Sequence, residues 1–387
     1  MSRRALSDNL DLASGQGDGP TDLIGSPQGG EVPAEQRRWS ASDSEYMQRA
    51  ISLATSTHPH PNPRVGAVVV SNRAVIAEAA HKKAGQPHAE ALALQLAGAQ
   101  AAGATVYVTL EPCSHVGRTP PCSQALIEAG VAKVVVGAID PDQRVHGSGI
   151  EELRAAGIEV VAGVNAEDVE AADPGYFHHR RTGLPLVTLK LATTLDGQIA
   201  AADRTSKWIT GEEARRDGHR LRAEADLVIV GAGTVLDDDP RLDVRLDGYT
   251  GSQPRPVIVA GRRDLPETAA LYGRDALVFT SRPLDIPAEQ VTAGDAGRID
   301  LRAMIEDLGR RGYVSALVEG GATLAAELVR GGHVDRIVFH LAAKLGLGQG
   351  IGAFGGEFKT ITEAVPLLIE SVDRIGSDIR VQARVGS

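Results

Sequence analysis

Cysteine residues and long apolar runs are scarce in this chain, and each scarcity excludes a class of protein. Only two of the 387 residues are cysteines, Cys113 and Cys122, which is too few for a disulfide-stabilised scaffold. No apolar run reaches the roughly 18 residues that a membrane-spanning helix needs. The N-terminal segment lacks an apolar stretch, so we expect no signal peptide and a location in the reducing cytoplasm.

Aromatic residues and excess positive charge are missing as well. Aromatic side chains make up 3% of the chain, and 40 Lys and Arg residues stand against 50 Asp and Glu residues, a net charge of −10. Because an acidic chain repels phosphate backbones, nucleic acid is not expected as the main partner. The hydrophobic content of 42% is ordinary for a globular protein with sizeable cores.

The length of the chain favours two domains, and the composition of residues 1–40 sets them apart from both. Residues 1–40 are rich in Gly, Ser, Pro, Asp and Gln and bury too little apolar surface to become ordered, which predicts a disordered tail. A helix is expected to begin near Ser42, with Ser42 or Asp43 as its N-cap. We predict one domain over 41–165, a linker over 166–185 and a second domain over 186–387.

Both predicted domains alternate strands with short helices, which indicates α/β domains with mostly parallel sheets. In the first domain we expect strands at 65–70, 75–80, 105–110, 134–138 and 158–162, and helices at 88–102, 123–129 and 149–156. In the second we expect strands at 186–192, 227–231, 257–260, 276–280, 313–318 and 334–342, and helices at 212–223, 300–311 and 322–330.

His88, Cys113 and Cys122 form the most informative group of residues in the sequence. One imidazole and two thiolates can hold a zinc ion that keeps a fourth position open for water. Glu90 follows the histidine by two residues, where it can take a proton from water and pass it to a leaving amine. His-x-Glu followed by Pro-Cys and a second cysteine is the pattern of zinc-dependent nucleobase deaminases. We therefore predict hydrolytic deamination in the first domain.

Two alternatives remain open for this group. A purely structural zinc site needs a fourth protein ligand, which His115 could supply, and the domain would then be a binding module without turnover. A deaminase that acts on a base within RNA or DNA is the second alternative. It needs a basic groove with aromatic side chains, which the composition disfavours.

Three stretches of the first domain resemble the bifunctional deaminase–reductases of riboflavin biosynthesis. They are residues 60–66 (HPNPRVG), 84–90 (AGQPHAE) and 109–122 (TLEPCSHVGRTPPC). Eight residues separate the two cysteines, whereas nucleic-acid-editing deaminases usually have two. The resemblance, which extends over about residues 44–345, implies that His88, Cys113 and Cys122 hold Zn²⁺, that Glu90 shuttles protons and that Asn62 lies in a pyrimidine pocket.

The chain departs from the pattern of this family at two places. Ala77 and Ala79 stand where the family tends to have glycines, and Asp142 and Gln143 stand where an Asn-Pro pair is expected. Neither place touches the zinc motif. The second place is the one at which substrate contacts could differ.

The second domain offers weaker patterns of its own. Residues 319–324 (EGGATL) follow an expected strand and open an expected helix, so that backbone N–H groups can approach an anion. The run does not match Gly-x-Gly-x-x-Gly, so a Rossmann domain is not expected. Taken alone, residues 237–239 indicate a solvated acidic loop and Trp208 a core aromatic, and whether this half binds a nucleotide stays open.

Four stretches of the second domain are similar to the reductase half of the same family: residues 190–197, 206–210, 233–242 and 319–321. The resemblance implies a cytidine-deaminase-like α/β/α zinc domain followed by a dihydrofolate-reductase-like α/β domain that uses NADPH. It places the cofactor against Ala192, Trp208, Thr234, Asp238, Gly321, Ala322, Thr323 and Leu324. It places the substrate against Ser206, Arg222, Leu242, Arg245 and Glu319, although Arg222 can equally be a surface residue of its helix.

The resemblance implies a two-step reaction on one small phosphorylated pyrimidine. The first domain would deaminate 2,5-diamino-6-(5-phosphoribosylamino)pyrimidin-4-one, and the second would use NADPH to reduce the ribosyl side chain to ribityl. Guanidinium groups suit such a substrate because they bind phosphate through two parallel hydrogen bonds. We expect neither nucleic acid nor a membrane as a partner, and the resemblance implies homo-oligomers formed through the reductase domain.

Overall fold

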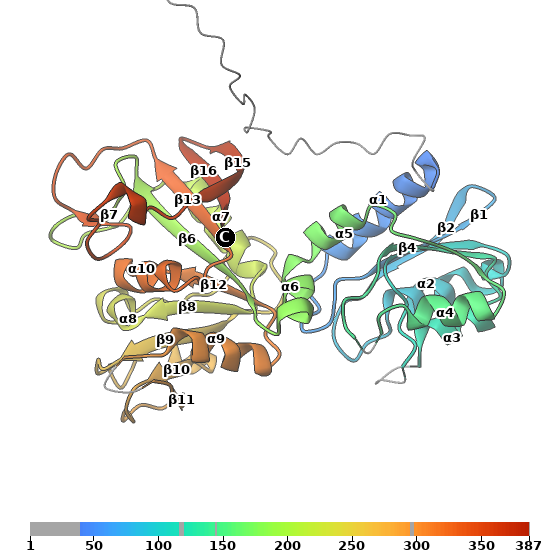
Figure 1. Cartoon of the computed structure of the whole chain (residues 1–387), viewed down its shortest axis with the longest axis horizontal. Coiled ribbons are helices and arrows are strands. Elements are labelled where there is room, and N and C mark those ends of the chain that lie inside the picture. Colours follow the sequence, from blue (N-terminus) through green and yellow to red (C-terminus); the bar gives the residue numbers. More distant parts are fainter. Residues whose placement is uncertain (1–38, 116–119, 144, 295–297, 387) are drawn as a thin grey trace, which may run out of the picture. The chain divides into compact units, whose positions relative to one another are not determined.

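Helix α1 (Ala41–Thr55) is the first helix of the computed structural model, which describes residues 39–115, 120–143, 145–294 and 298–386 (Figure 1). The predicted disordered tail, apart from its last two residues, and part of the cysteine motif (116–119) lie outside the described residues. The helix begins before Ser42, so the predicted N-cap is wrong. Asp43 instead lies in the first turn, where its carboxylate accepts a hydrogen bond from the Tyr107 hydroxyl at 2.8 Å.

The first sheet has the strand order β2-β1-β3-β4-β5. Its strands are β1 (Gly66–Ser71), β2 (Ala74–Ala80), β3 (Thr105–Leu110), β4 (Lys133–Ala138) and β5 (Glu159–Ala162). Strand β1 runs antiparallel to β2 and β3, while β3, β4 and β5 are mutually parallel. The hairpin and every strand expected in this half are present, and the α/β class is confirmed.

Helices cover both faces of this sheet (Figure 1). Helix α1 and α5 (Ala166–Ala172) pack on one face. The other carries α2 (Ala89–Ala97), extended by the 3₁₀ turn η2 (Gly98–Ala101), with α3 (Cys122–Glu128) and α4 (Ser148–Ala155). The predicted linker is largely helical: α5 is followed by α6 (Pro174–Thr182), which contacts strands of the second sheet.

The second sheet has nine strands in the order β11-β10-β9-β8-β12-β6-β13-β16-β15. They are β6 (Leu186–Thr194), β8 (Leu227–Gly231), β9 (Arg255–Gly261), β10 (Leu277–Thr280), β11 (Glu289–Thr292), β12 (Ser315–Glu319), β13 (Arg336–Ala342), β15 (Leu367–Ile375) and β16 (Asp378–Val385). Strands from β11 to β13 are parallel, and the β15–β16 hairpin adds antiparallel to β13. The two short strands β7 (Gln198–Ala200) and β14 (Ile351–Gly352) form a separate ladder.

Helices α7 (Glu212–Ala223), α8 (Ala232–Asp238), α9 (Leu301–Arg310) and α10 (Ala322–Arg330) accompany this sheet, with 3₁₀ turns η3 (Tyr272–Arg274) and η4 (Ile361–Glu363). Residues 237–239, interpreted from the sequence as a loop, include the end of α8. No described helix has the length and apolar character to cross a bilayer.

A crevice forms where the second sheet changes direction. The chain leaves β8 through α8 toward β9 on one side, and it leaves β12 through α10 toward β13 on the other. In open α/β sheets, ligands bind outside the carboxyl ends of strands at such a switch point. Leu189, Leu227, Phe279 and Met304 are fully buried and anchor the strands beneath it.

Candidate active sites in two domains

The three predicted zinc ligands converge at the carboxyl end of β3. His88 is the N-cap of α2, Cys113 follows β3, and Cys122 is the first residue of α3. The His88 Nδ1 atom lies 3.3 Å from Cys122 Sγ and 3.6 Å from Cys113 Sγ. One donor atom from each residue lies within 4.8 Å of the others, and the cysteines are not bonded to each other. One imidazole and two thiolates fit Zn²⁺ and leave a fourth position open.

Glu111 holds the strand end that carries Cys113. Its buried carboxylate accepts hydrogen bonds from the backbone N–H groups of Gly147 at 2.9 Å and Gly149 at 3.0 Å, which ties β3 to the start of α4. A Cβ atom on Gly149 would lie 1.9 Å from the Pro112 carbonyl oxygen. The site therefore needs a glycine at position 149, because this residue packs against Pro112, the residue directly before the zinc-ligating Cys113.

Burial and the neighbouring thiols set the charges of this site. Glu90 is 3% exposed, and burial raises its pKa to about 6. A hydrogen bond from Cys122 lowers the pKa of the Cys113 thiol well below its usual range, while the same hydrogen bond raises that of Cys122. The N-termini of α2 and α3 face this cluster, and their partial positive charge favours thiolates.

A pocket of about 470 Å³ opens onto Glu90 and two of the metal-ligating residues. Asn62, predicted in the pyrimidine pocket, lines it and donates from Nδ2 to His81 Nε2 at 3.0 Å. His115 also lines the pocket but is outside the group of donor atoms. The geometry thus disfavours a structural site with His115 as fourth ligand.

Sequence reasoning missed several polar residues of this pocket, notably His81, Tyr176 and Arg180. The Arg180 guanidinium lies 5.0 Å from the centre of the Tyr176 ring, and its Nε lies 3.5 Å from an oxygen of Asp142. Asp142 is one of the residues that departs from the family pattern, so this departure does face the pocket. Arg180 belongs to the HHRR run at 178–181, which lies within the stretch predicted as a linker.

A larger cavity, of about 660 Å³, lies beyond the carboxyl ends of β8 and β9, against α9 and α10. Four of the predicted cofactor contacts line it: Thr234, Gly321, Thr323 and Leu324. Gly320 has φ of +108°, and a Cβ there would lie 2.8 Å from Thr234 Oγ1. Only glycine suits position 320, because it adopts this positive φ readily and has no side chain to collide with Thr234. The cavity also contains Arg263 and Arg298, which the sequence analysis missed and for which the described residues provide no side-chain partner.

A separate hollow of about 430 Å³ beside Lys344 is lined by Trp208, a predicted cofactor contact, and by Ser206, a predicted substrate contact. The Trp208 side chain is 65% exposed, with Arg215 over its ring at 4.6 Å, so its interpretation as a core aromatic is wrong. Ala192, Ala322 and Asp238 line neither space, and Asp238 instead pairs with Lys207 at 3.2 Å.

Apart from Ser206, the predicted substrate contacts of the second domain gather around Asp243. Arg222 binds the Glu319 carboxylate through two hydrogen bonds, of 2.5 and 3.0 Å, and donates to the Asp243 carbonyl at 3.0 Å. Arg222 is therefore a largely buried, paired residue and not a surface residue of its helix. Arg245 pairs with the Asp243 carboxylate at 3.0 Å and is 56% exposed, while Leu242 is buried.

The fold and these sites define a two-domain enzyme, in which a zinc-dependent deaminase precedes a reductase with a dinucleotide-sized crevice. Residues 40–138 match the family model of the cytidine and deoxycytidylate deaminase zinc-binding region, and residues 185–381 match that of the RibD C-terminal domain. The riboflavin biosynthesis protein RibD of Aquifex aeolicus is 39% identical over 87% of this chain and 97% of its own. RibD of Mycobacterium tuberculosis is 42% identical over 83% and 90%.

Solved structures of RibD proteins have the same arrangement of elements. A structure of Acinetobacter baumannii RibD gives a TM-score of 0.83 at 38% identity and covers 89% of this chain and 99% of its own. A deaminase/reductase from Thermotoga maritima gives 0.82 at 34% identity, with the same coverage. The chain belongs to the RibD family: it is a bifunctional enzyme of riboflavin biosynthesis, a pyrimidine deaminase and a reductase, whose domains imply Zn²⁺ and NADPH.

The donor geometry predicts one zinc ion per chain. In Cys113→Ser the bound zinc should fall below about a tenth of that amount, because a neutral hydroxyl replaces a thiolate ligand. His115→Ala, the matched control, should keep its zinc, since His115 lies outside the donor group. Metal content of purified protein measured by mass spectrometry checks both. Loss of zinc from the His115 variant would instead support the structural four-ligand site.

Proposed function

We propose that this enzyme deaminates 2,5-diamino-6-(5-phosphoribosylamino)pyrimidin-4-one and then reduces the ribosyl side chain of the product to ribityl with NADPH. The Thermotoga maritima relative is named as a diaminohydroxyphosphoribosylaminopyrimidine deaminase and 5-amino-6-(5-phosphoribosylamino)uracil reductase. The observation that carries the proposal is the buried Glu90 carboxylate beside the His88, Cys113 and Cys122 donors, in a pocket of a size that suits a pyrimidine.

The deaminase step needs one residue that moves protons and others that hold the ring. Zinc, when bound by His88, Cys113 and Cys122, supplies a Lewis acid that activates water. Glu90 takes a proton from that water and delivers it to the exocyclic nitrogen, so that a C–O bond forms, the C–N bond breaks and ammonia leaves. Asn62, fixed by His81, orients the pyrimidine within the pocket.

The reductase step needs the sugar and the nicotinamide to meet in the second domain. NADPH supplies the hydride, and we propose that Ala192, Trp208, Thr234, Asp238, Gly321, Ala322, Thr323 and Leu324 contact it. The pyrophosphate suits the N-terminus of α10, where N–H groups have no partner within the helix. Ser206, Arg222, Leu242, Arg245 and Glu319 are proposed to contact the substrate, and the exposed Arg245 suits its phosphate.

Arg263 and Arg298 make the cavity suitable for NADPH in particular. Both lie in the cavity at the carboxyl ends of the strands, and the described residues neutralise neither guanidinium. A 2′-phosphate is a dianionic group that NADH lacks, and guanidinium groups bind it bidentately. These arginines therefore favour NADPH over NADH.

We propose that copies of the chain associate through the reductase domain and that the enzyme acts in the cytoplasm. Strand β15 is at the edge of the second sheet and exposes apolar side chains: Leu367, Leu368, Ile369 and Val372. Such an edge tends to pair with another chain. The two unbridged thiols, both needed as metal ligands, suit a reducing compartment.

Replacing Glu90 by Gln should lower ammonia release by about 10²–10⁴-fold, because the proton carrier is lost while the shape of the side chain is kept. NADPH oxidation with the deaminated intermediate should not change. Both rates are measured on zinc-loaded protein, with Glu128→Gln, an exposed residue of α3, as the control. Normal ammonia release by the Glu90 variant would refute the assigned role.

Arg263→Ala should raise the KM for NADPH by about 10-fold or more, the loss expected for a hydrogen-bonded ion pair with phosphate. The KM for NADH should stay within about twofold, because NADH has no 2′-phosphate. Initial-rate kinetics with both cofactors measure this, and Arg310→Ala, an exposed residue of α9, is the matched control. An equal rise for both cofactors would place Arg263 elsewhere in the site.

If the edge strand β15 mediates association, adding charge to this strand should change the oligomeric state. The double variant Ile369→Lys/Val372→Lys should shift the protein from oligomer to monomer, since charges on an edge strand oppose pairing. Light scattering coupled to gel filtration gives the mass. Leu96→Lys, which charges an equally exposed apolar residue in the deaminase domain, should leave the mass unchanged. An oligomer that persists in the double variant would mean that another surface mediates association.

A further inference from the structure

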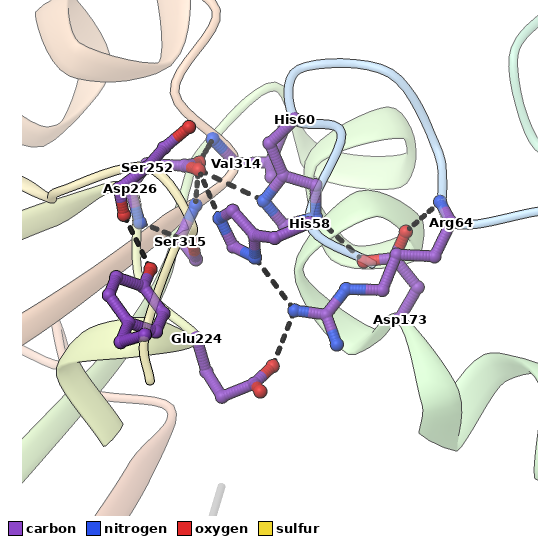
Figure 2. Close-up of polar contacts among 10 residues, drawn as sticks. His58, His60, Arg64, Asp173, Glu224, Asp226, Ser252, Val314 and Ser315 are labelled. Atoms are coloured by element: carbon purple, nitrogen blue, oxygen red, sulfur yellow. Dashed lines mark hydrogen bonds and ion pairs between the residues drawn. The ribbon is translucent and has the colours of Figure 1, made fainter. Parts of the chain in front are cut away.

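A cluster of buried charges connects the deaminase loop 56–65, between α1 and β1, to the reductase sheet (Figure 2). His60, at its centre, is 4% exposed at its side chain. Its Nε2 lies 3.0 Å from Asp173, between α5 and α6, and its Nδ1 lies 2.9 Å from Asp226, directly before β8. Ionised carboxylates only accept hydrogen bonds, so both ring nitrogens carry protons and His60 is an imidazolium.

Asp226 is itself held rigidly by the reductase domain. Its Oδ2 accepts from the backbone N–H groups of Val314 at 2.8 Å and Ser315 at 3.1 Å, at the start of the central strand β12. Its own N–H donates to Ser315 Oγ at 3.0 Å. Oδ1 is left to face His60 and, at 3.3 Å, His58. The Asp226 carboxylate is thus held by the second sheet and faces the deaminase loop.

The same loop is attached on the other side of Asn62. The Arg64 N–H donates to Asp173 at 2.8 Å, and its guanidinium donates to His58 Nδ1 at 2.8 Å and pairs with Glu224, at the end of α7. His60 and Arg64 each stand two residues from Asn62 in sequence. Asn62 lines the deaminase pocket between these two attachment points.

His58, His60 and Asp226 also have donor atoms close enough for a metal ion. The hydrogen bond from Arg64 opposes that interpretation. A guanidinium can only donate, so His58 Nδ1 accepts, and the ring proton of His58 lies on Nε2, the atom that faces Asp226. A nitrogen that carries a proton cannot be a ligand. The histidine nitrogens that face Asp226 therefore carry protons and do not bind a second metal ion.

We propose that Asp226, a residue of the reductase domain, is a positioning residue for the deaminase reaction, because through His60 it holds the loop that places Asn62 in the pyrimidine pocket. This inference rests on the function proposed above for that pocket. A displacement of about 1 Å in a positioning group can lower a rate by about 10²-fold. One domain of the enzyme thereby completes the active site of the other.

The link has a characteristic pH dependence. Asp173 and Asp226 face His60 directly, and Arg64 and Glu224 lie around them. The centre of the His58 ring lies 4.2 Å from that of His60, with the two rings tilted by 50°. Burial lowers the pKa of His60, but the hydrogen bonds and charges of Asp173 and Asp226 outweigh it and raise the pKa to about 9. Because the folded-state pKa is raised, the link is intact at neutral pH and is lost as the pH rises through about 9.

The test uses full-length, zinc-loaded protein with both reactions measured separately. Asp226→Asn should lower the deaminase kcat/KM by about 10-fold or more, with reductase activity on the deaminated intermediate within about twofold. His60→Gln should have the same effect. The double variant should lose no more deaminase activity than either single variant, because each of the three variants breaks the same link between His60 and Asp226. Asp285→Asn, an exposed carboxylate of the reductase domain, is the control.

Wild-type deaminase activity should fall as the pH rises through about 9, and His60→Gln should lack this decline, a difference that a purely structural role would not produce. Deaminase activity that survives in both single variants overturns the proposal, as do equal losses in both reactions or a second zinc per chain that His60→Gln removes. If Asp226→Asn does not fold, His60→Gln decides. A wild-type protein that releases no ammonia would refute the proposed function instead.

Discussion

Two thiolates and an imidazole must lie within reach of one ion, and this constraint organises the deaminase domain. Cys113 follows the buried strand β3, while His88 and Cys122 stand at the N-termini of two helices packed on the same face of the sheet. Helix N-termini favour negative charge, which suits the thiolates. Glu90 shares the helix of His88, so the proton carrier and the metal site are positioned by one element.

The same geometry recurs in the reductase domain with a different ligand. There the carboxyl ends of parallel strands and the starts of α8 and α10 enclose a crevice that suits the phosphates of a dinucleotide. Both active sites thus lie where parallel strands end and helices begin. The cluster of His60 and Asp226 joins the opposite, N-terminal end of β8 to the deaminase loop, so the two sites depend on different ends of one sheet.

Local patterns in the sequence were sufficient for most of the fold because the buried parallel strands are short, nearly continuous apolar runs between glycine-containing turns. They were not sufficient for β15, whose apolar residues are largely exposed, or for β16, in which charged and polar residues interrupt the apolar ones. They also failed for α8, whose acidic end resembles a loop, and for Trp208, because a large aromatic residue is usually buried. In these elements tertiary pairing, and not local propensity, decides the structure.

What the sequence determined by itself is the chemistry: a histidine, two cysteines and a glutamate in a fixed order specify a donor set and a proton carrier wherever the chain places them. What only the tertiary structure decided is which other residues lie beside them. His81 beside Asn62, Arg263 in the crevice and Asp226 against His60 are pairs or placements that span elements distant in sequence. No local pattern encodes such pairs, because burial and hydrogen bonding across elements exist only after the sheets have formed.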